Sequence, residues 1–210
     1  MRGGPTRFRL RPSGSGGPAE ASRRRVARAA LGLRALPDYL EPSLDLVLVG
    51  INPGVRSAEL GHHFAGVGNK FWNLLFESGL VPRRMTYEED FRLPEHGIGI
   101  TNIVARASRS STDLGRKDFE RGRGSLLAKI EKYRPRTAAF VGVTVFRELW
   151  PAIATGPAPR EIPCGPRPET IGKTRLFVLP NPSGRNAHFT YAEMLSHWRG
   201  LAHFSRRLDA

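Results

Sequence analysis

Two hydrophobic patterns alternate along the chain from residue 36 onward. In the first, a short apolar run ends at a glycine, a proline or a polar residue, as at residues 45–50, which is typical of a buried strand. In the second, apolar residues recur every three or four positions, which is typical of a helix with one buried face. Strands are expected at residues 45–50, 97–101, 137–141 and 176–179, and helices at residues 70–79, 118–133, 144–150 and 190–208.

The order of these elements predicts the fold class. Strands that alternate with helices favour a parallel sheet, because the link between two parallel strands has to cross back over the sheet. We therefore expect one α/β domain over residues 36–210, with three layers (α/β/α) around a central, mainly parallel four-stranded sheet. Thr190 and Glu193 have the spacing of a capping box and mark the start of the last helix.

Residues 1–35 have a different composition. The first 20 residues are mostly Gly, Pro, Ser and Arg and hold too few apolar side chains to form a core, and we expect residues 1–35 to be a basic, disordered tail. Residues 21–35 could form a short basic helix. An arm that grasps phosphates, a terminus without a role and an organelle transit peptide all remain open for this segment.

The net charge of +14 changes the picture of the partner. Residues 1–35 hold nine arginines and one acidic residue, but the rest of the chain still has 24 basic and 18 acidic residues. This favours a polyanionic partner such as nucleic acid, with a merely solvated basic surface as the alternative. No apolar run reaches about 18 residues, so we expect no membrane-spanning helix. The lone cysteine, Cys164, excludes a disulfide framework, an iron–sulfur cluster and a multi-cysteine zinc site.

Candidate chemistry lies where three expected strands end. Residues 50–54, 101–102 and 180–185 are polar or tightly turned, and ligands of open α/β sheets bind at the carboxyl ends of the strands. Pro53 restricts Asn52 to an extended conformation, so that the Asn52 amide could hold a water molecule or the polar edge of a base. The alternative is an Asx-turn that only closes the strand.

Two further segments offer binding groups. Phe64, in a glycine-rich segment, could stack on a planar base or pack in the core. Polar groups and free backbone N–H groups at residues 181–185 suit a phosphate, unless this loop is only solvated. Neighbouring His62 and His63 point in different directions, and the other histidines lack ligand spacing, so we expect no metal and no cofactor.

Taken together, five segments resemble the mismatch-specific uracil/thymine DNA glycosylases, a family of the uracil-DNA glycosylase superfamily. They occur in the same order and at similar spacing, and the resemblance extends over about residues 36–204. The first and the last segment together are quite specific. The five segments are GINPG at 50–54, GHHF at 61–64, GNKFW at 68–72, GIGITN at 97–102 and PNPSG at 180–184.

The resemblance implies a role for each residue of the base pocket. Asn52 occupies the position of the catalytic asparagine that orients the hydrolytic water. The base that is flipped out of the duplex would be bound by Ile51, His63, Phe64 and Asn102. Phe64 would stack on this base, and Asn102 would read its polar edge.

The resemblance also implies a DNA-binding loop. Asn181, Ser183 and Gly184 lie where the family grips backbone phosphates, and Arg185 lies where it inserts a wedge into the gap left by the flipped nucleotide. Family members often carry a lysine near Val143, so the phosphate contact of that lysine is absent from this sequence.

The activity that this resemblance implies is that of a monofunctional DNA glycosylase of base excision repair. It would hydrolyse the N-glycosidic bond of uracil, best in G·U mismatches, and leave an abasic site. Thymine and modified cytosine are further candidate bases, and the hydroxyl of Ser57 favours uracil. We expect a monomer in the bacterial cytoplasm, associated with the nucleoid during repair, that binds double-stranded DNA with uracil or mismatches and no membrane.

Two other functions remain open. The protein could bind damaged DNA without turnover, or it could be an α/β enzyme that acts on free nucleosides or nucleotides. A steep salt dependence of duplex binding would favour either DNA function over the nucleotide enzyme. Loss of base release without loss of binding in Asn52→Ala would favour the glycosylase over the binder.

Overall fold

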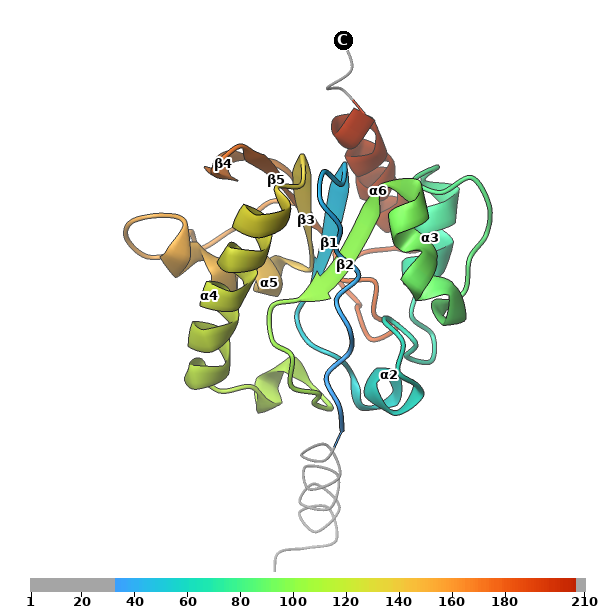
Figure 1. Ribbon diagram of the computed structural model, residues 1–210, viewed down its shortest axis with the longest axis horizontal. Helices are drawn as coiled ribbons and strands as arrows, with labels where there is room; N and C mark the ends of the chain where they lie inside the picture. Colours follow the sequence, from blue (N-terminus) through green and yellow to red (C-terminus); the bar gives the residue numbers. More distant parts are fainter. Residues whose placement is uncertain (1–32, 207–210) are drawn as a thin grey trace, which may run out of the picture.

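A five-stranded sheet runs through the middle of the protein, with helices on both faces (Figure 1). The computed structural model describes residues 33–206. The strand order is β2-β1-β3-β5-β4, in which β4 runs antiparallel to β5 and all other neighbours are parallel. The strands are β1 (Leu46–Gly50), β2 (Ile98–Asn102), β3 (Thr137–Val141), β4 (Gly165–Ile171) and β5 (Thr174–Leu179).

The predicted α/β class and the four predicted strands are confirmed, but the prediction of four strands in the sheet is wrong. Strand β4 has no apolar run and contains Pro166 and Pro168. Because β4 lies at the edge and pairs only with β5, the missing N–H groups of the two prolines break no second ladder. A two-residue turn with Gly172 at φ 58° joins the two strands.

The predicted helices are found within a few residues of their expected bounds, and Glu193 closes the capping box by accepting the N–H of Thr190 at 2.7 Å. The short helix α2 and the 3-10 segment η1 were not predicted, because neither has a repeated apolar spacing. The tail and the basic helix expected over residues 1–35 lie almost entirely outside the described residues. The helices are α2 (Val55–Leu60), α3 (Phe71–Glu77), α4 (Arg116–Tyr133), α5 (Val143–Leu149) and α6 (Tyr191–Arg206), with 3-10 segments η1 (Tyr87–His96), η2 (Ser111–Asp113) and η3 (Trp150–Ala152).

The apolar runs of the strands separate two cores. Leu46 and Leu48 of β1 point to the layer of α3 and α6, whereas Val47 and Val49 point to the layer of α4 and α5. All four side chains are at most 2% exposed, and each such burial contributes about 1.5–3 kcal/mol. Figure 1 shows these layers on opposite sides of the sheet, as the predicted three-layer arrangement requires.

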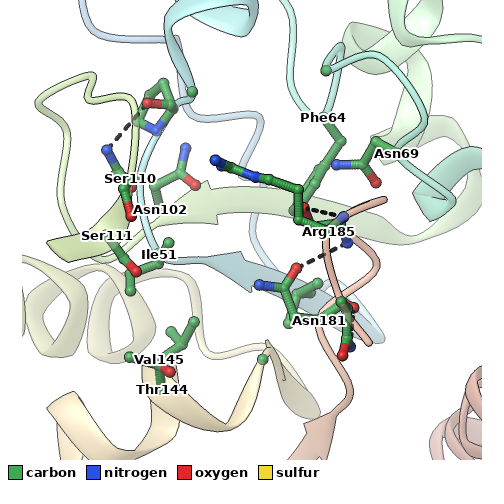
Figure 2. Close-up of a pocket in the computed structure, with 18 of the residues that line it drawn as sticks. Ile51, Phe64, Asn69, Asn102, Ser110, Ser111, Thr144, Val145, Asn181 and Arg185 are labelled. Atoms are coloured by element: carbon green, nitrogen blue, oxygen red, sulfur yellow. Dashed lines mark hydrogen bonds between the residues drawn. The ribbon is translucent and has the colours of Figure 1, made fainter. Parts of the chain in front are cut away.

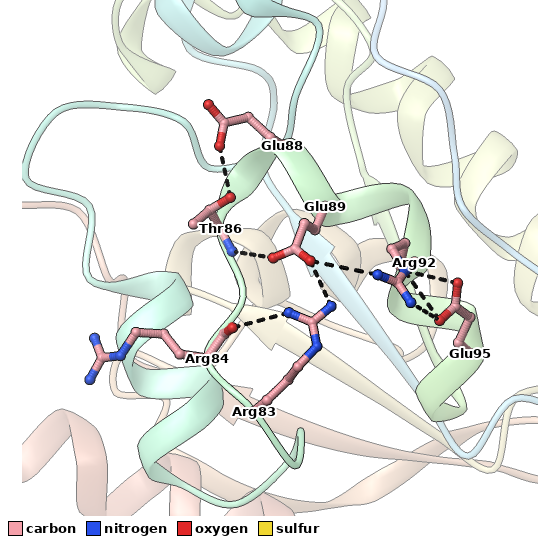
Figure 3. A network of polar contacts seen from close by, with 7 residues as sticks. All are labelled: Arg83, Arg84, Thr86, Glu88, Glu89, Arg92 and Glu95. Carbon is pink, nitrogen blue, oxygen red and sulfur yellow. Dashed lines mark hydrogen bonds and ion pairs between the residues drawn. The ribbon is translucent and has the colours of Figure 1, made fainter.

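A network of surface ion pairs surrounds the start of η1 (Figure 3). Glu89 accepts the backbone N–H of Thr86 at 3.2 Å and an Arg83 N–H at 2.6 Å, while Arg92 pairs with Glu95 at 2.9 Å. The next residue after Glu89 is Asp90, which is fully buried. The network thus lies on the surface beside the residue whose carboxylate contacts His62 and His63.

Two glycines of α4 predict opposite effects of the same substitution. A Cβ atom on Gly122 would lie 2.2 Å from the backbone oxygen of Ile103, whereas a Cβ on Gly124 would meet nothing within 4 Å. We expect Gly124→Ala to raise the free energy of unfolding by about 1 kcal/mol, because alanine favours the helix. Gly122→Ala should lower it by about 1–3 kcal/mol through overpacking. Urea unfolding of both variants tests this, and equal effects would contradict the packing of α4 on the loop after β2.

Candidate functional site

A cavity of about 670 Å³ opens at the carboxyl edge of the sheet (Figure 2). The segments that follow β1, β2, β3 and β5 all contribute to its walls. The chain after β1 passes to α2 and α3 on one side of the sheet, and the chain after β3 passes to α5 on the other. Such a switch point is where open α/β sheets bind their ligands.

Eight of the nine predicted site residues line this cavity. The ninth, Gly184, lies in the loop that forms one rim and packs against Gly68, as described below. The eight that line the cavity are Ile51, Asn52, His63, Phe64, Asn102, Asn181, Ser183 and Arg185.

The Asn52 amide has a defined orientation. Its Nδ2 atom lies 2.8 Å from Ser108 Oγ, 3.0 Å from the carbonyl oxygen of Arg106 and 3.1 Å from that of Pro53. Two of these three partners can only accept, so the amide nitrogen and not the oxygen must face them. No described residue donates a hydrogen bond to Oδ1, which leaves this oxygen as the acceptor available to a ligand or a water.

Backbone hydrogen bonds hold the segments on both sides of Asn52. Beyond the end of β2, Ile103 and Val104 donate their N–H groups to the carbonyl oxygens of Gly50 and Ile51, both at 2.9 Å. The N–H of Ser108 donates to Pro53 at 3.0 Å. Because the two loops stay paired past the sheet, Asn52 sits on a rigid support.

Phe64 forms an aromatic wall in a strained backbone conformation. Its ring stacks on Phe71, with the centroids 3.9 Å apart and the planes within 5°, and it lines the cavity. Its φ of 52° is left-handed, which costs a non-glycine residue about 1–2 kcal/mol. The buried Ser57 stabilises this turn, since its Oγ accepts the N–H of Ala65 at 3.0 Å. Such strain at a cavity wall is typical of a functional position.

His63 is a neutral, buried support for Asn102. Its Nε2 donates to the carbonyl oxygen of Pro37 at 2.8 Å, so Nδ1 carries the lone pair and faces Asn102 Nδ2 at 3.4 Å. The backbone N–H of His63 donates to Oδ2 of the buried Asp90 carboxylate at 2.7 Å. Burial lowers the pKa of His63 below its ordinary value of 6.5. Asn102 Oδ1 then lies over Gly50, where an added Cβ would approach it to 2.4 Å.

This burial predicts a pH dependence of stability. Below about pH 6.5 the unfolded chain takes up a proton on His63 that the folded protein does not bind. The free energy of unfolding should therefore fall as the pH drops from 7.5 toward and through the lowered pKa. In His63→Gln, whose amide can still donate to Pro37, the fall should be shallower. Urea unfolding at several pH values checks this, and identical slopes in the two proteins would contradict it.

His62 points away from His63. Its Nδ1 lies 3.0 Å from Asp90 Oδ1, whereas His63 contacts Oδ2 of the same carboxylate through its backbone N–H. Within residues 33–206, no group of three or more His, Cys, Asp or Glu side chains is arranged to hold a metal ion. In the same part of the chain, no helix has the length and apolar character needed to cross a membrane.

The loop after β5 is built around its own amide groups. Asn181 Oδ1 accepts the N–H of Ser183 at 3.0 Å, and the Asn181 carbonyl accepts Asn186 Nδ2 at 2.7 Å. Gly184 packs on the loop after Phe64, where an added Cβ would lie 2.8 Å from the carbonyl oxygen of Gly68. The two loops therefore form one rim of the cavity.

Arg185 crosses the mouth of the cavity (Figure 2). Its Nη2 donates to the carbonyl oxygen of Arg109 at 3.2 Å, which joins the rim after β5 to the loop after β2. The side chain is exposed, and a single exposed hydrogen bond of this kind contributes only about 1 kcal/mol. An anionic ligand can therefore replace the Arg109 carbonyl oxygen as the partner of Arg185.

The Arg, Lys, Asp and Glu side chains of the cavity wall, as far as the described residues go, all carry positive charge. Among the described residues, Arg109 and Arg185 are the only Arg, Lys, Asp or Glu side chains that line it. Val143, the first residue of α5, lines the wall without a charge. A polyanion can approach this cavity without meeting a carboxylate among the described residues that line it.

A family model of the uracil DNA glycosylase superfamily matches residues 37–202. The chain belongs to the uracil DNA glycosylase superfamily. It is 34% identical, over 173 residues, to a G/U mismatch-specific uracil DNA glycosylase of Schizosaccharomyces pombe, a match that covers 81% of this chain. The chain spans about half (53%) of the length of that relative.

The fold of this superfamily member also has a counterpart among solved structures. The solution NMR structure of a candidate uracil DNA glycosylase from Methanosarcina acetivorans superimposes with a TM-score of 0.56 at 18% sequence identity. The match covers 82% of this chain and 97% of that one, so it shows a shared fold.

Sequence reasoning missed the loop that orients the amide in this glycosylase-superfamily cavity. Arg106 and Ser108 lie 54 and 56 residues from Asn52 and belong to no recognised motif. Only the polar end of β2, at residues 101–102, indicated that the following loop would reach the cavity.

Proposed function

We propose that this protein is a monofunctional DNA glycosylase that removes uracil from DNA, best from G·U mismatches, and leaves an abasic site. One observation carries the proposal: the Asn52 amide is fixed by three acceptors, so that Oδ1 is left for a water beside the aromatic wall of Phe64. The S. pombe relative, named as a G/U mismatch-specific uracil DNA glycosylase, supports it. Double-stranded DNA with uracil or mismatches is then the substrate, and the monomer acts without a cofactor.

The first step brings the base into the cavity. A base inside a duplex is out of reach, so the nucleotide has to be flipped out, at a cost of a few kcal/mol that is smaller for a mismatch. Stacking of the flipped base on Phe64 returns about 1–3 kcal/mol. Arg185 leaves the Arg109 carbonyl and fills the gap in the duplex. The side-chain Nδ2 group of Asn181 and the hydroxyl of Ser183 bind the neighbouring phosphates, since the backbone N–H groups of Ser183 and Arg185 already donate within the loop.

The second step breaks the N-glycosidic bond. The electron pair of the C1′–N1 bond leaves with the base as an anion, and the sugar becomes cation-like. Water held at Asn52 Oδ1 forms the new bond to C1′ and loses its proton to solvent, since a neutral amide takes up no proton at neutral pH. Within the described lining of the cavity there is no lysine to form a covalent intermediate with the sugar, which supports hydrolysis without strand cleavage.

Base selection rests on Asn102 and its support. An asparagine amide offers one acceptor and donors, which complement the N3–H and O4 groups on the edge of uracil. The neutral His63 holds one Asn102 N–H, so the position of this amide is set before the base arrives. The buried Ser57 lies in the same wall as Phe64, and its hydroxyl favours uracil over thymine, which stays a second candidate base.

A panel of labelled oligonucleotides tests the proposed function. Single-turnover base release is measured on duplexes with G·U, A·U and G·T and on single-stranded uracil, beside free deoxyuridine. We expect release to be fastest from G·U and absent from the free nucleoside. Duplex binding without any release would favour the non-catalytic binder, and release from deoxyuridine with weak, salt-independent DNA binding would favour the nucleoside enzyme.

A further inference from the structure

Arg106 links Asn52 to the start of α4 through two different parts of the same residue. Its carbonyl oxygen accepts Asn52 Nδ2 at 3.0 Å. Its guanidinium donates to both carboxylate oxygens of Asp118, at 2.7 and 3.3 Å, and to the carbonyl oxygen of Asp113 at 2.9 Å. The side chain therefore anchors the residue whose backbone holds the amide.

Asp118 is itself held in place by the first turn of α4. Its Oδ2 accepts the N–H of Gly115 at 2.9 Å, so the carboxylate is bound from the helix and from Arg106 at once. The hydrogen bond from Arg106, followed by that from Gly115, lowers the pKa of Asp118 below its ordinary range. The carboxylate is thus charged throughout the neutral pH range, and a forked pair with arginine is among the most directional of protein contacts.

We propose that Arg106 and Asp118 are positioning residues for the reaction, which set the rotation of the Asn52 amide. The inference rests on the proposed function and deepens it. Without the pair, the backbone at Arg106 is free to shift, and Nδ2 keeps only Ser108 Oγ and the neighbouring Pro53 carbonyl as partners. Oδ1 then no longer points in one direction, and misplacement of a reacting group by about 1 Å can slow a reaction 100-fold.

The same pair has only a small role in holding the fold. Arg106 and Asp118 have 38% and 28% of their side-chain surface exposed, and ion pairs at such exposure contribute little to stability. Ser108, which is buried, donates to the Ser110 carbonyl at 2.7 Å and keeps its part of the loop without Arg106. A loss of rate without a loss of stability is therefore the signature that separates positioning from folding.

The test compares Arg106→Gln and Asp118→Asn with Arg116→Gln. Arg116 pairs with Glu120 at 2.6 Å on the exposed face of the same helix, so its variant loses the same positive charge without touching the loop. We measure the single-turnover rate constant on a G·U duplex at saturating protein, the duplex affinity and the melting temperature. Both site variants should be slowed about 10-fold or more, and Arg106→Gln should keep the affinity and melting temperature of Arg116→Gln. Arg106→Lys, which keeps the charge, should recover part of the rate.

A second comparison shows whether the pair acts through Asn52. In an Asn52→Ala background, Arg106→Gln should cause no further loss, because the amide that it positions is gone. A further 10-fold loss there, or equal rates for Arg106→Gln and Arg116→Gln, overturns this inference and leaves the proposed function intact. Absence of release by the wild-type protein instead overturns the proposed function, and this inference with it.

Discussion

Asn52→Ala is expected to lower the single-turnover rate of uracil release by about 100-fold or more, because the reacting water is no longer held in position. Duplex affinity should stay close to that of the wild type, because Asn52 lies inside the cavity and contacts the loop after β2. Rate and affinity are measured on the same G·U oligonucleotide.

Two further variants sharpen this prediction. Asn52→Asp should lose activity as well, since a carboxylate oxygen would face the carbonyl oxygens of Arg106 and Pro53 in place of the amide nitrogen. Asn73→Ala, the same change on the exposed side of α3, is the control and should retain the wild-type rate. An Asn52→Ala protein within a few-fold of this control would remove Asn52 from the reaction.

Phe64→Ala carries the second large effect. The ring is proposed to stack on the flipped base, and such stacking contributes about 1–3 kcal/mol, or roughly 5–150-fold in the single-turnover rate. Phe64→Tyr keeps the ring and should stay near the wild type. The ring lies on the surface of Phe71 and is half-buried, so the variant should still fold.

The matched control for Phe64 is Phe91→Ala. Phe91 is 56% exposed on η1 and does not line the cavity. Fluorescence of a 2-aminopurine placed beside the uracil reports flipping separately from bond cleavage, and the Phe64→Ala protein should show a reduced flipping signal. A full signal with a slow rate, or a Phe64→Ala rate equal to that of Phe91→Ala, would contradict a stacking role.

The sequence predicted those parts of the fold that depend on burial. The runs that became β1 and β3 are apolar at almost every position, because these central strands are covered on both faces. Strand β4 was missed because its pairing with β5 defines it, and no apolar run does. Its residues alternate between exposed and less exposed positions, and Pro166 and Pro168 are among the exposed ones. Hydrogen bonding of an exposed edge leaves no hydrophobic pattern to detect.

The candidate site divides in a similar way. Asn52 could be predicted because Pro53 and the end of a strand are local signals, and the resemblance to a known family supplied the roles of Phe64 and Asn102. Two features of the site could not be predicted from the sequence, because both arise from loops that meet only in the folded chain. They are the left-handed backbone of Phe64 and the contact between Arg106 and Asn52. The orienting network therefore emerges from the structure alone.

If this cavity hydrolyses the N-glycosidic bond of uracil in DNA, free uracil and an abasic site must form together. The most direct measurement incubates excess protein with a G·U duplex and quantifies both free uracil, by mass spectrometry, and strand scission after alkali. We expect one uracil released and one alkali-labile abasic site formed per duplex, with intact strands before alkali. A duplex that stays intact after alkali while bound by the protein, with no free uracil, would contradict it.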